Sequence, residues 1–213
     1  MPKNHKSAQK ILDISLKLFN KHGFENVRMQ DIVDKLATYG LSKGAIYHYF
    51  DSKDDILESI FWQYEQQIKQ IWQIQYPHKN GRDKIKTIIM QHLDYMLKHK
   101  AFVQDSNTLF GSFRALGYRL KHNHIVPIVE SLIEEGNNDG SLNVAYPKAA
   151  SQMLVWGVYV WLDSALYPLS QIEYTHKVRH LRIMCEGVGL SVIDEEISSE
   201  LLRVWQEIAR GGK

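Results

Sequence analysis

Apolar residues recur with helical spacing along nearly the whole chain. The first stripe consists of Ile11, Ile14, Leu18 and Phe19. These positions fall at i, i+3, i+7 and i+8, which places their side chains on one face of an α-helix. Gly23 then ends this helix, because glycine accepts the left-handed conformation of a C-terminal cap. No stretch shows the sustained alternation of a half-buried strand, so the pattern predicts an all-α protein of about nine or ten helices.

Two further short helices are expected directly after the first. The second begins near residue 28 and ends at Gly40, where a glycine adopts positive φ without steric cost. Ser42 is placed to cap the start of the third helix. Ser52 and Asp55 have the spacing of a capping box and start the next helix. Three short helices, with a tight turn between the second and the third, predict a helix-turn-helix arrangement.

Longer helical segments follow, separated by residues that break helices. They are expected at residues 54–75, 82–100, 105–121, 125–135, 147–167, 174–190 and 197–210. Pro127 is tolerable in the first turn of its helix, where no backbone N–H is needed, and Pro168 stops the long apolar segment before it. We therefore expect two domains, residues 1–53 with the short helices and residues 54–213 with the longer ones.

The composition is that of a soluble globular protein, with 44% hydrophobic and 23% charged residues. No run approaches the roughly 20 apolar residues that a membrane-spanning helix needs, and the first residues lack the apolar stretch of a signal peptide. The single cysteine, Cys185, cannot form an internal disulfide, which suits a reducing compartment. We therefore expect a cytoplasmic protein without a membrane partner.

The charge is distributed unevenly along the chain. Residues 1–53 carry nine basic and five acidic residues, a net charge of +4. The remainder carries 17 basic and 19 acidic residues, a net charge of −2. A basic end on a slightly acidic body favours an anionic partner at that end, although such a charge also occurs on ordinary protein surfaces.

The third short helix has one apolar and one polar side. Ile46 and Phe50 lie one turn apart, and we expect both to face the core. The residues on the other side are Lys43, Gly44, Tyr47 and His48. A helix N-terminus attracts phosphate, glycine lets a duplex approach closely, tyrosine donates to phosphate and histidine reaches base edges. This side therefore suits DNA, with an ordinary solvated surface as the alternative.

Several motifs occur together in the first part of the chain. They are F-x-x-x-G-F at residues 19–24, D-I at 31–32, GLSKGAIYHYFDSK at 40–53 and D-I-L at 55–57. Over residues 8–61 this pattern resembles the N-terminal DNA-binding domain of the TetR family of transcriptional regulators. The resemblance implies DNA contacts by Ser42, Lys43, Tyr47, His48 and Lys53, with Arg28 at another commonly used position. Together with Gly44, these residues form the predicted DNA-binding set.

The same resemblance implies a regulator, most often a repressor, that binds a palindromic double-stranded DNA operator as a homodimer and is released by a small-molecule effector. In the family, late helices of the larger C-terminal helical domain form the dimer contact. The corresponding residues here are Met153, Leu154, Gly157, Trp161, Val178, Leu181 and Cys185. A purely intramolecular core is the alternative for these helices.

A pocket for an unknown small-molecule effector is implied in the same way. Its main candidate residues are Met90, Met96, Phe110, Phe113, Trp156 and Tyr159, and Trp62, Tyr64 and His92 are further candidates. Aromatic and methionine side chains suit a medium-sized apolar or aromatic molecule. Each of these residues also has the ordinary alternative of a place in the core.

The chain departs from the family pattern in two places. Val27-Arg28 stands where relatives often carry threonine at the start of the second helix, so a side-chain cap would have to come from Asn26. Ala37–Tyr39 adds about three residues before the turn. At 1.5 Å per residue, this addition extends the second helix by roughly 4.5 Å or bulges the turn. Either outcome would shift the third helix.

Other functions leave weaker signals. The sequence lacks a Gly-rich phosphate loop and any Ser or Cys in a nucleophile setting, so we expect neither an enzyme nor a cofactor. His176 and His180, or His122 and His124, lack the further ligands of a metal site. An enzyme, a helical metal or cofactor carrier and a protein-interaction bundle without DNA reading are the alternatives.

Overall fold

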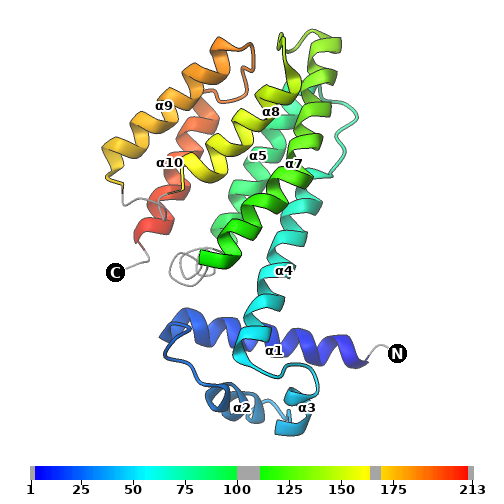
Figure 1. The fold of residues 1–213 in the computed structure, drawn as a ribbon, viewed down its shortest axis with the longest axis vertical. Coiled ribbons are helices and arrows are strands. Elements are labelled where there is room, and N and C mark those ends of the chain that lie inside the picture. The colour runs from blue at the N-terminus through cyan, green and yellow to red at the C-terminus, as the bar shows by residue number, and fades with distance from the viewer. Residues whose placement is uncertain (1–2, 100–110, 164–168, 211–213) are drawn as a thin grey trace. The chain divides into compact units, whose positions relative to one another are not determined.

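The computed structural model describes residues 3–99, 111–163 and 169–210, with the side chains of residues 3–5, 111–116 and 210 left undescribed. Its helices are α1 (Lys3–His22), α2 (Met29–Ala37), α3 (Lys43–Tyr47), α4 (Lys53–Trp72), α5 (Gly81–Lys98), α7 (Gly111–Asp139), α8 (Pro147–Trp156), α9 (Gln171–Gly187) and α10 (Glu195–Arg210), with a π-helical segment η1 (Gly157–Trp161). Within these ranges there is no strand, so the predicted all-α class is confirmed (Figure 1).

The chain divides into two compact units. The division falls inside α4, between Gln66 and Gln67. The domain boundary expected at residue 53 stays a prediction. The first half of α4 carries Ile56 and Ile60, both buried. A helix that buries apolar residues in a unit belongs to that unit's core, which explains why the first unit extends past the three short helices.

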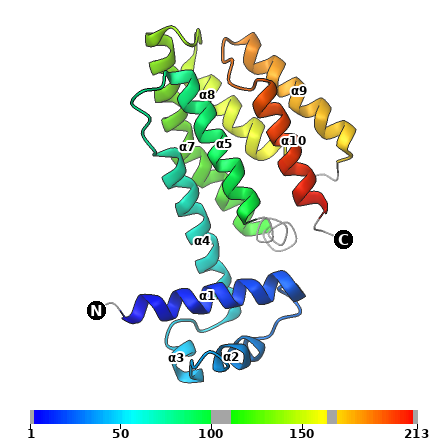
Figure 2. The same cartoon turned by 180° about the vertical axis from the view of Figure 1, so that it is seen from behind.

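The first unit packs α1, α2 and α3 around one apolar core. Its fully buried large side chains are Ile11, Phe19, Ile32, Leu36, Ile46 and Ile56. The ring of Phe19 lies edge-on to that of Phe24, with centroids 5.0 Å apart, which is a favoured aromatic geometry. Figure 2 shows α2 and α3 lying beside one another below α1. Both contact pairs, α1 with α2 and α2 with α3, follow from the apolar stripes of the sequence.

The turn between α2 and α3 is closed by Gly40. The N–H of Gly40 donates to the carbonyl of Ala37 at 2.9 Å, and that of Leu41 donates to the carbonyl of Leu36 at 3.2 Å. This pair of bonds is a Schellman motif, and Gly40 has the required left-handed conformation, with φ of 80°. α2 therefore ends at Ala37, and Thr38 and Tyr39 form the turn that Gly40 closes. The three residues expected to be added here relative to the family pattern stay a prediction.

The second unit is a layered helical bundle. α5 packs on α7 and α10, α7 packs on α8, and α9 packs on α8 and α10 (Figures 1 and 2). Its buried side chains include Ile85, Ile88, Ile89, Ile125, Ile133, Leu154 and Leu181. Gly157 allows a close approach of the α8–η1 segment to α9, because a Cβ there would lie 2.5 Å from Leu181 Cδ1.

The segments predicted at 105–121 and 125–135 are not separate helices. Within the described residues they form one 29-residue helix, α7, with Pro127 in its interior. An interior proline removes one backbone hydrogen bond and costs about 3 kcal/mol. Pro127 lies on the exposed side, where water reaches the freed carbonyl, while Val129 and Ile133 are completely buried. Burial of the apolar side outweighs the local cost.

The helix predicted at residues 147–167 is also interrupted. α8 ends at Trp156 and continues as the five-residue π-helical segment η1, in which the N–H of Leu162 donates to the carbonyl of Gly157 at 3.0 Å. Residues 164–168 lie outside the described residues. A π-helical turn inserts one extra residue, so apolar periodicity does not reveal it. Such turns are frequent at functional sites.

We expect Gly40→Ala and Gly44→Ala to change stability in opposite directions. In both cases the added Cβ would meet no atom within 4 Å, so only backbone conformation differs. Alanine at a φ of 80° should lower the free energy of unfolding by about 1 kcal/mol. At Gly44, inside α3, alanine should raise it by about 0.5 kcal/mol. Urea unfolding followed by circular dichroism measures both, and equal effects would contradict the Schellman assignment.

Candidate nucleic-acid interface

The short helix α3 is fixed at its N-terminus by its own cap and on one side by the core. Ser42 Oγ accepts the backbone N–H of Ala45 at 3.2 Å, as the sequence predicts for an N-cap. Ile46 is completely buried and Phe50 is 9% exposed. With the apolar side packed inward, the opposite side of α3 must face solvent.

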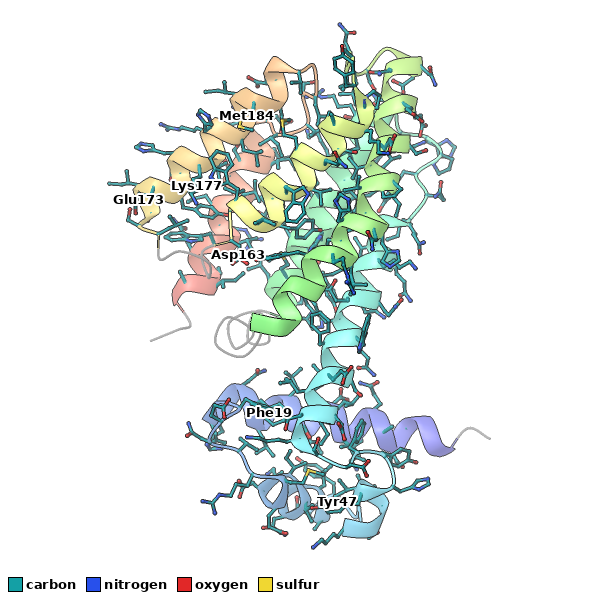
Figure 3. The ribbon with its side chains drawn as sticks, viewed as in Figure 1. Phe19, Tyr47, Asp163, Glu173, Lys177 and Met184 are labelled. Atoms are coloured by element: carbon teal, nitrogen blue, oxygen red, sulfur yellow. The ribbon has the colours of Figure 1, made fainter. Side chains whose placement is uncertain are left out.

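The solvent-facing side of α3 holds the predicted DNA-reading residues together. Lys43, Gly44, Tyr47 and His48 are all exposed. The ammonium group of Lys43 lies 5.8 Å from the centroid of the Tyr47 ring, and Figure 3 shows Tyr47 on α3. Around Gly44 there is open space where a Cβ would be. These four residues and Ser42 form the α3 face, a polar surface with one cation, one phenol and one imidazole.

Arg28 is exposed at the start of α2, where its backbone N–H donates to Asp31 Oδ2 at 2.7 Å. A capping box has two hydrogen bonds, and here only the one to the Asp31 carboxylate can form. The other needs an acceptor on the side chain of residue 28, and arginine has none. Asn26 does not cap this helix. Its Nδ2 donates to the carbonyl of His22 at 2.9 Å and so satisfies the end of α1. The guanidinium of Arg28 is left to solvent.

Lys53 lies in a different environment from the α3 face. Its ammonium group donates to the carbonyl of Phe24 at 3.0 Å and lies 4.2 Å from the centroid of the Phe24 ring. The side chain is half-buried. These contacts tie the start of α4 to the end of α1, a structural role that sequence spacing alone did not indicate.

A second cation–aromatic cluster lies at the turn after α2. The exposed ring of Tyr39 has the ammonium groups of Lys10 and Lys35 at 5.1 and 5.9 Å from its centroid. Lys10 also donates to the carbonyl of Tyr39 at 3.3 Å. Lys10 lies 29 residues before Tyr39, so this contact has no periodic signal, and the cluster was not predicted. It links α1 to the turn after α2.

The residues predicted for an effector pocket differ in their exposure, and not all of them are described by the structure. Met90 and Met96 are half-buried on α5, and Trp156 is 41% exposed at the end of α8. Phe110 lies outside the described residues, and the side chain of Phe113 is not described. Tyr159 is half-buried and its hydroxyl is hydrogen-bonded to His92 Nδ1. The structure thus brings Tyr159 to α5.

Most of the residues predicted for a dimer interface lie inside the protomer. Leu154, Gly157, Val178, Leu181 and Cys185 are buried in the core between α8, α9 and α10, while Met153 and Trp161 are half-buried. Burial raises the pKa of the Cys185 thiol to about 12, with a further contribution from the neighbouring Glu186 carboxylate. Such a thiol is protonated and behaves as a small apolar side chain. A second copy would have to contact the outward residues of these helices.

Two further properties concern the described residues only. Among them, no group of three or more His, Cys, Asp or Glu side chains is arranged to hold a metal ion. None of the helices in the described ranges is both long and apolar enough to span a bilayer.

The first unit matches a known family. Residues 11–60 match the model of the family described as bacterial regulatory proteins, tetR family. This range contains α2 and α3 and the residues of the α3 face. No curated protein matches the chain.

Solved structures with the same fold extend the likeness to both units. A TetR/AcrR-family transcriptional regulator from Thermobifida fusca is 21% identical, with a TM-score of 0.61, and the match covers 92% of this chain and 97% of that one. A TetR-family regulator from Pectobacterium atrosepticum is 19% identical, with a TM-score of 0.62 and coverage of 88% and 96%.

SmeT, the repressor of the SmeDEF multidrug efflux pump of Stenotrophomonas maltophilia, is 16% identical, with a TM-score of 0.63 and coverage of 88% and 92%. At these identities the likeness concerns the fold. Residues 11–60 therefore match the tetR family of bacterial regulatory proteins, and the chain as a whole has the fold of the solved TetR-family regulators.

Proposed function

We propose that this protein is a ligand-responsive repressor that binds a palindromic operator as a homodimer and leaves it when a small-molecule effector binds. The observation that carries the proposal is the α3 face, where Lys43, Tyr47 and His48 are exposed together on a helix whose other side is buried. Repression is supported by the likeness to SmeT, which is itself a repressor.

The α3 face has the chemistry that DNA recognition requires. A lysine and a tyrosine hydroxyl bind phosphate oxygens and set the position of the helix, while an imidazole reads base edges in the major groove. Arg28, exposed at the start of α2, can bind the backbone beside that groove. Lys53 contributes less directly, because its ammonium group is already held by the Phe24 carbonyl.

Two features support a homodimer: the small contact area of a single helix-turn-helix, and the exposed apolar residues on the surface of α9. A single helix-turn-helix makes few phosphate contacts, and two-fold dimers double them on a palindrome. On α9, Ile172 is 68% exposed and Ile183 is 63% exposed. These residues are separated by close to three helical turns and so share one side. Large exposed isoleucines on one helix face favour a second copy as the partner.

Release by an effector requires different affinities for two conformations of the dimer. A hundredfold loss of operator affinity corresponds to about 2.7 kcal/mol of differential binding. The second unit, with its own core and a π-helical segment, is where we place this effector.

Selection of bound DNA from a random pool by the purified protein is expected to return a palindrome. Because each protomer presents one α3 face, the two half-sites should be related by two-fold symmetry. The Schellman motif at Gly40 fixes the turn between α2 and α3, so one defined half-site spacing is expected. Recovery of unrelated sequences, or of none above the input pool, would contradict DNA reading.

Lys43→Ala is expected to lower the affinity for the selected DNA by roughly tenfold at moderate salt. The slope of log K against log salt should fall by about 2 units, since a dimer loses two phosphate contacts. Fluorescence anisotropy at several salt concentrations measures both quantities. Lys148→Ala, which removes an exposed lysine from α8, is the matched control and should change neither. An unchanged slope for Lys43→Ala would argue against a phosphate contact.

Ile183→Glu is expected to convert the dimer to monomers at micromolar concentration, because it places two like charges across an apolar contact. Sedimentation velocity measures this directly. Ile74→Glu is the control, since Ile74 is 42% exposed but lies after α4 and away from α9. If Ile183→Glu sediments like the wild type, α9 is not the interface. A wild type that is monomeric at all concentrations would refute the homodimer.

A further inference from the structure

One side of α9 is exposed and combines two isoleucines with two histidines. Ile172 is 68% exposed and Ile183 is 63% exposed, and His176 and His180 are exposed as well. At 3.6 residues per turn, these four residues fall within about 80° of one another around the helix. The opposite side of α9, which carries Val178, packs into the protomer's own core. We call the four exposed residues the α9 stripe.

The two histidines of the stripe have the spacing of a metal-binding pair. Residues four apart on a helix lie on neighbouring turns of one face, so imidazoles at i and i+4 can hold the same metal ion. The side chains of His176 and His180 both reach solvent. The ring of His180 lies nearly perpendicular to that of Trp161, at an angle of 82° with centroids 5.7 Å apart, and this contact restrains its orientation.

A single protomer supplies only part of a metal site around this pair. Within the described residues, no group of three or more His, Cys, Asp or Glu side chains is arranged to hold an ion. A protein-bound zinc ion takes four ligands in a tetrahedral arrangement. His176 and His180 therefore need two further ligands from outside the protomer.

The order of residues along the stripe makes it complementary to itself. When a helix packs on its own copy around a two-fold axis, the two run antiparallel, and residues equally far from the axis on opposite sides meet. The midpoint between Ile172 and Ile183 lies half a residue from the midpoint between His176 and His180. At 1.5 Å per residue, the two midpoints differ by only about 0.8 Å. One axis position, close to Val178, therefore brings isoleucine to isoleucine and histidine to histidine.

We propose that the α9 stripe binds one Zn²⁺ ion shared between two copies of this chain, with His176 and His180 of each copy as the four ligands. Four imidazoles are a suitable donor set for Zn²⁺, a cation that nitrogen ligands bind well. The isoleucines bury apolar surface in the same contact. The inference rests on the proposed homodimer, because the site is complete only when two copies meet.

The charges beside the stripe permit a cation there. Arg179 is exposed at the edge of the stripe, where its long side chain can extend into solvent. The ammonium group of Lys177 donates to the carbonyl of Trp161 at 2.9 Å. The guanidinium of Arg182 is paired with the Glu186 carboxylate at 2.8 Å. The neighbouring positive charges are thus bound elsewhere or able to point away from the ion.

A shared ion makes the amount of dimer depend on the metal. Anything that binds the dimer and not the monomer stabilises the dimer by mass action. The ion lies on α9, in a different unit from the α3 face. It therefore acts on operator binding through the concentration of dimer and leaves the reading of bases unchanged.

Sedimentation velocity of the full-length protein, first freed of metal with a chelator, tests the site. One Zn²⁺ per dimer should lower the dimer dissociation constant by about tenfold or more. Mg²⁺ should change it by less than about twofold, since this cation prefers oxygen ligands. A dissociation constant that Zn²⁺ leaves unchanged, or that Mg²⁺ lowers equally, would overturn the inference.

Variants locate the bound ion. His176→Ala and His180→Ala each remove two of the four ligands from the dimer, so either should reduce the effect of Zn²⁺ to less than about twofold. Both positions are exposed and alanine favours helix, so the fold is retained. The matched control replaces His78 and His124, two exposed histidines outside α9, and should keep the full effect. A full Zn²⁺ effect in the α9 variants, or its loss in the control, would overturn the assignment to the stripe.

Co²⁺ reports the geometry and the number of ions. A tetrahedral Co²⁺ ion absorbs visible light far more strongly than an octahedral one. On titration, the strong bands should reach their maximum at one ion per two chains, and a double variant of His176 and His180 should lack them. Saturation at one ion per chain, or only the weak bands of octahedral Co²⁺, would contradict a shared four-histidine site.

The outcomes separate this inference from the proposed function. A dimer that selects a palindrome but does not respond to Zn²⁺ overturns the shared metal site and leaves the regulator standing. A dimer that Zn²⁺ stabilises through α9 but that selects no DNA overturns the regulator and leaves the metal site standing. A chain that stays monomeric with and without Zn²⁺ overturns both the homodimer and the shared site.

Discussion

A helix of five residues cannot persist in water by itself, because forming its first turn costs more than its few hydrogen bonds return. α3 exists because Ile46 is completely buried and because Ser42 satisfies an N-terminal N–H. Full burial of one isoleucine contributes about 1.5–3 kcal/mol. The same anchoring leaves the α3 face exposed, so the constraint that stabilises the helix also presents the side that we propose to read DNA.

Contacts in the neighbouring segments hold α3 in place at both of its ends. The Schellman motif at Gly40 ends α2 with two defined hydrogen bonds. The lysines around the Tyr39 ring connect this end to α1, and Lys53 connects the start of α4 to Phe24. Because α3 is too short to orient itself, its position depends on the contacts at both of its ends.

The second unit follows a different design, in which polar groups lie inside an apolar bundle. The bonds among Trp72, His92 and Tyr159 satisfy most of these groups, and neutrality of His92 avoids burying a charge. Apolar periodicity predicted helices here but misjudged their breaks. Pro127 lies inside α7 because the burial of neighbouring apolar residues outweighs its cost. The helix that begins at Pro147 changes to π-helical at Gly157, and this change was not predicted because local propensity carries no signal for it.

The sequence by itself determined the helical class, the caps at Ser42 and Ser52, the glycine ends of α1 and α2, and the inward and outward sides of α3. These features depend on residues close in sequence, whose spacing fixes their geometry. Only the tertiary structure decided that Lys53 holds the Phe24 carbonyl, that Leu181 and Cys185 face the protomer's own core, and that His92 meets Trp72 and Tyr159. Those outcomes depend on which helices pack together, and a periodic pattern shows that a residue is buried without showing against what.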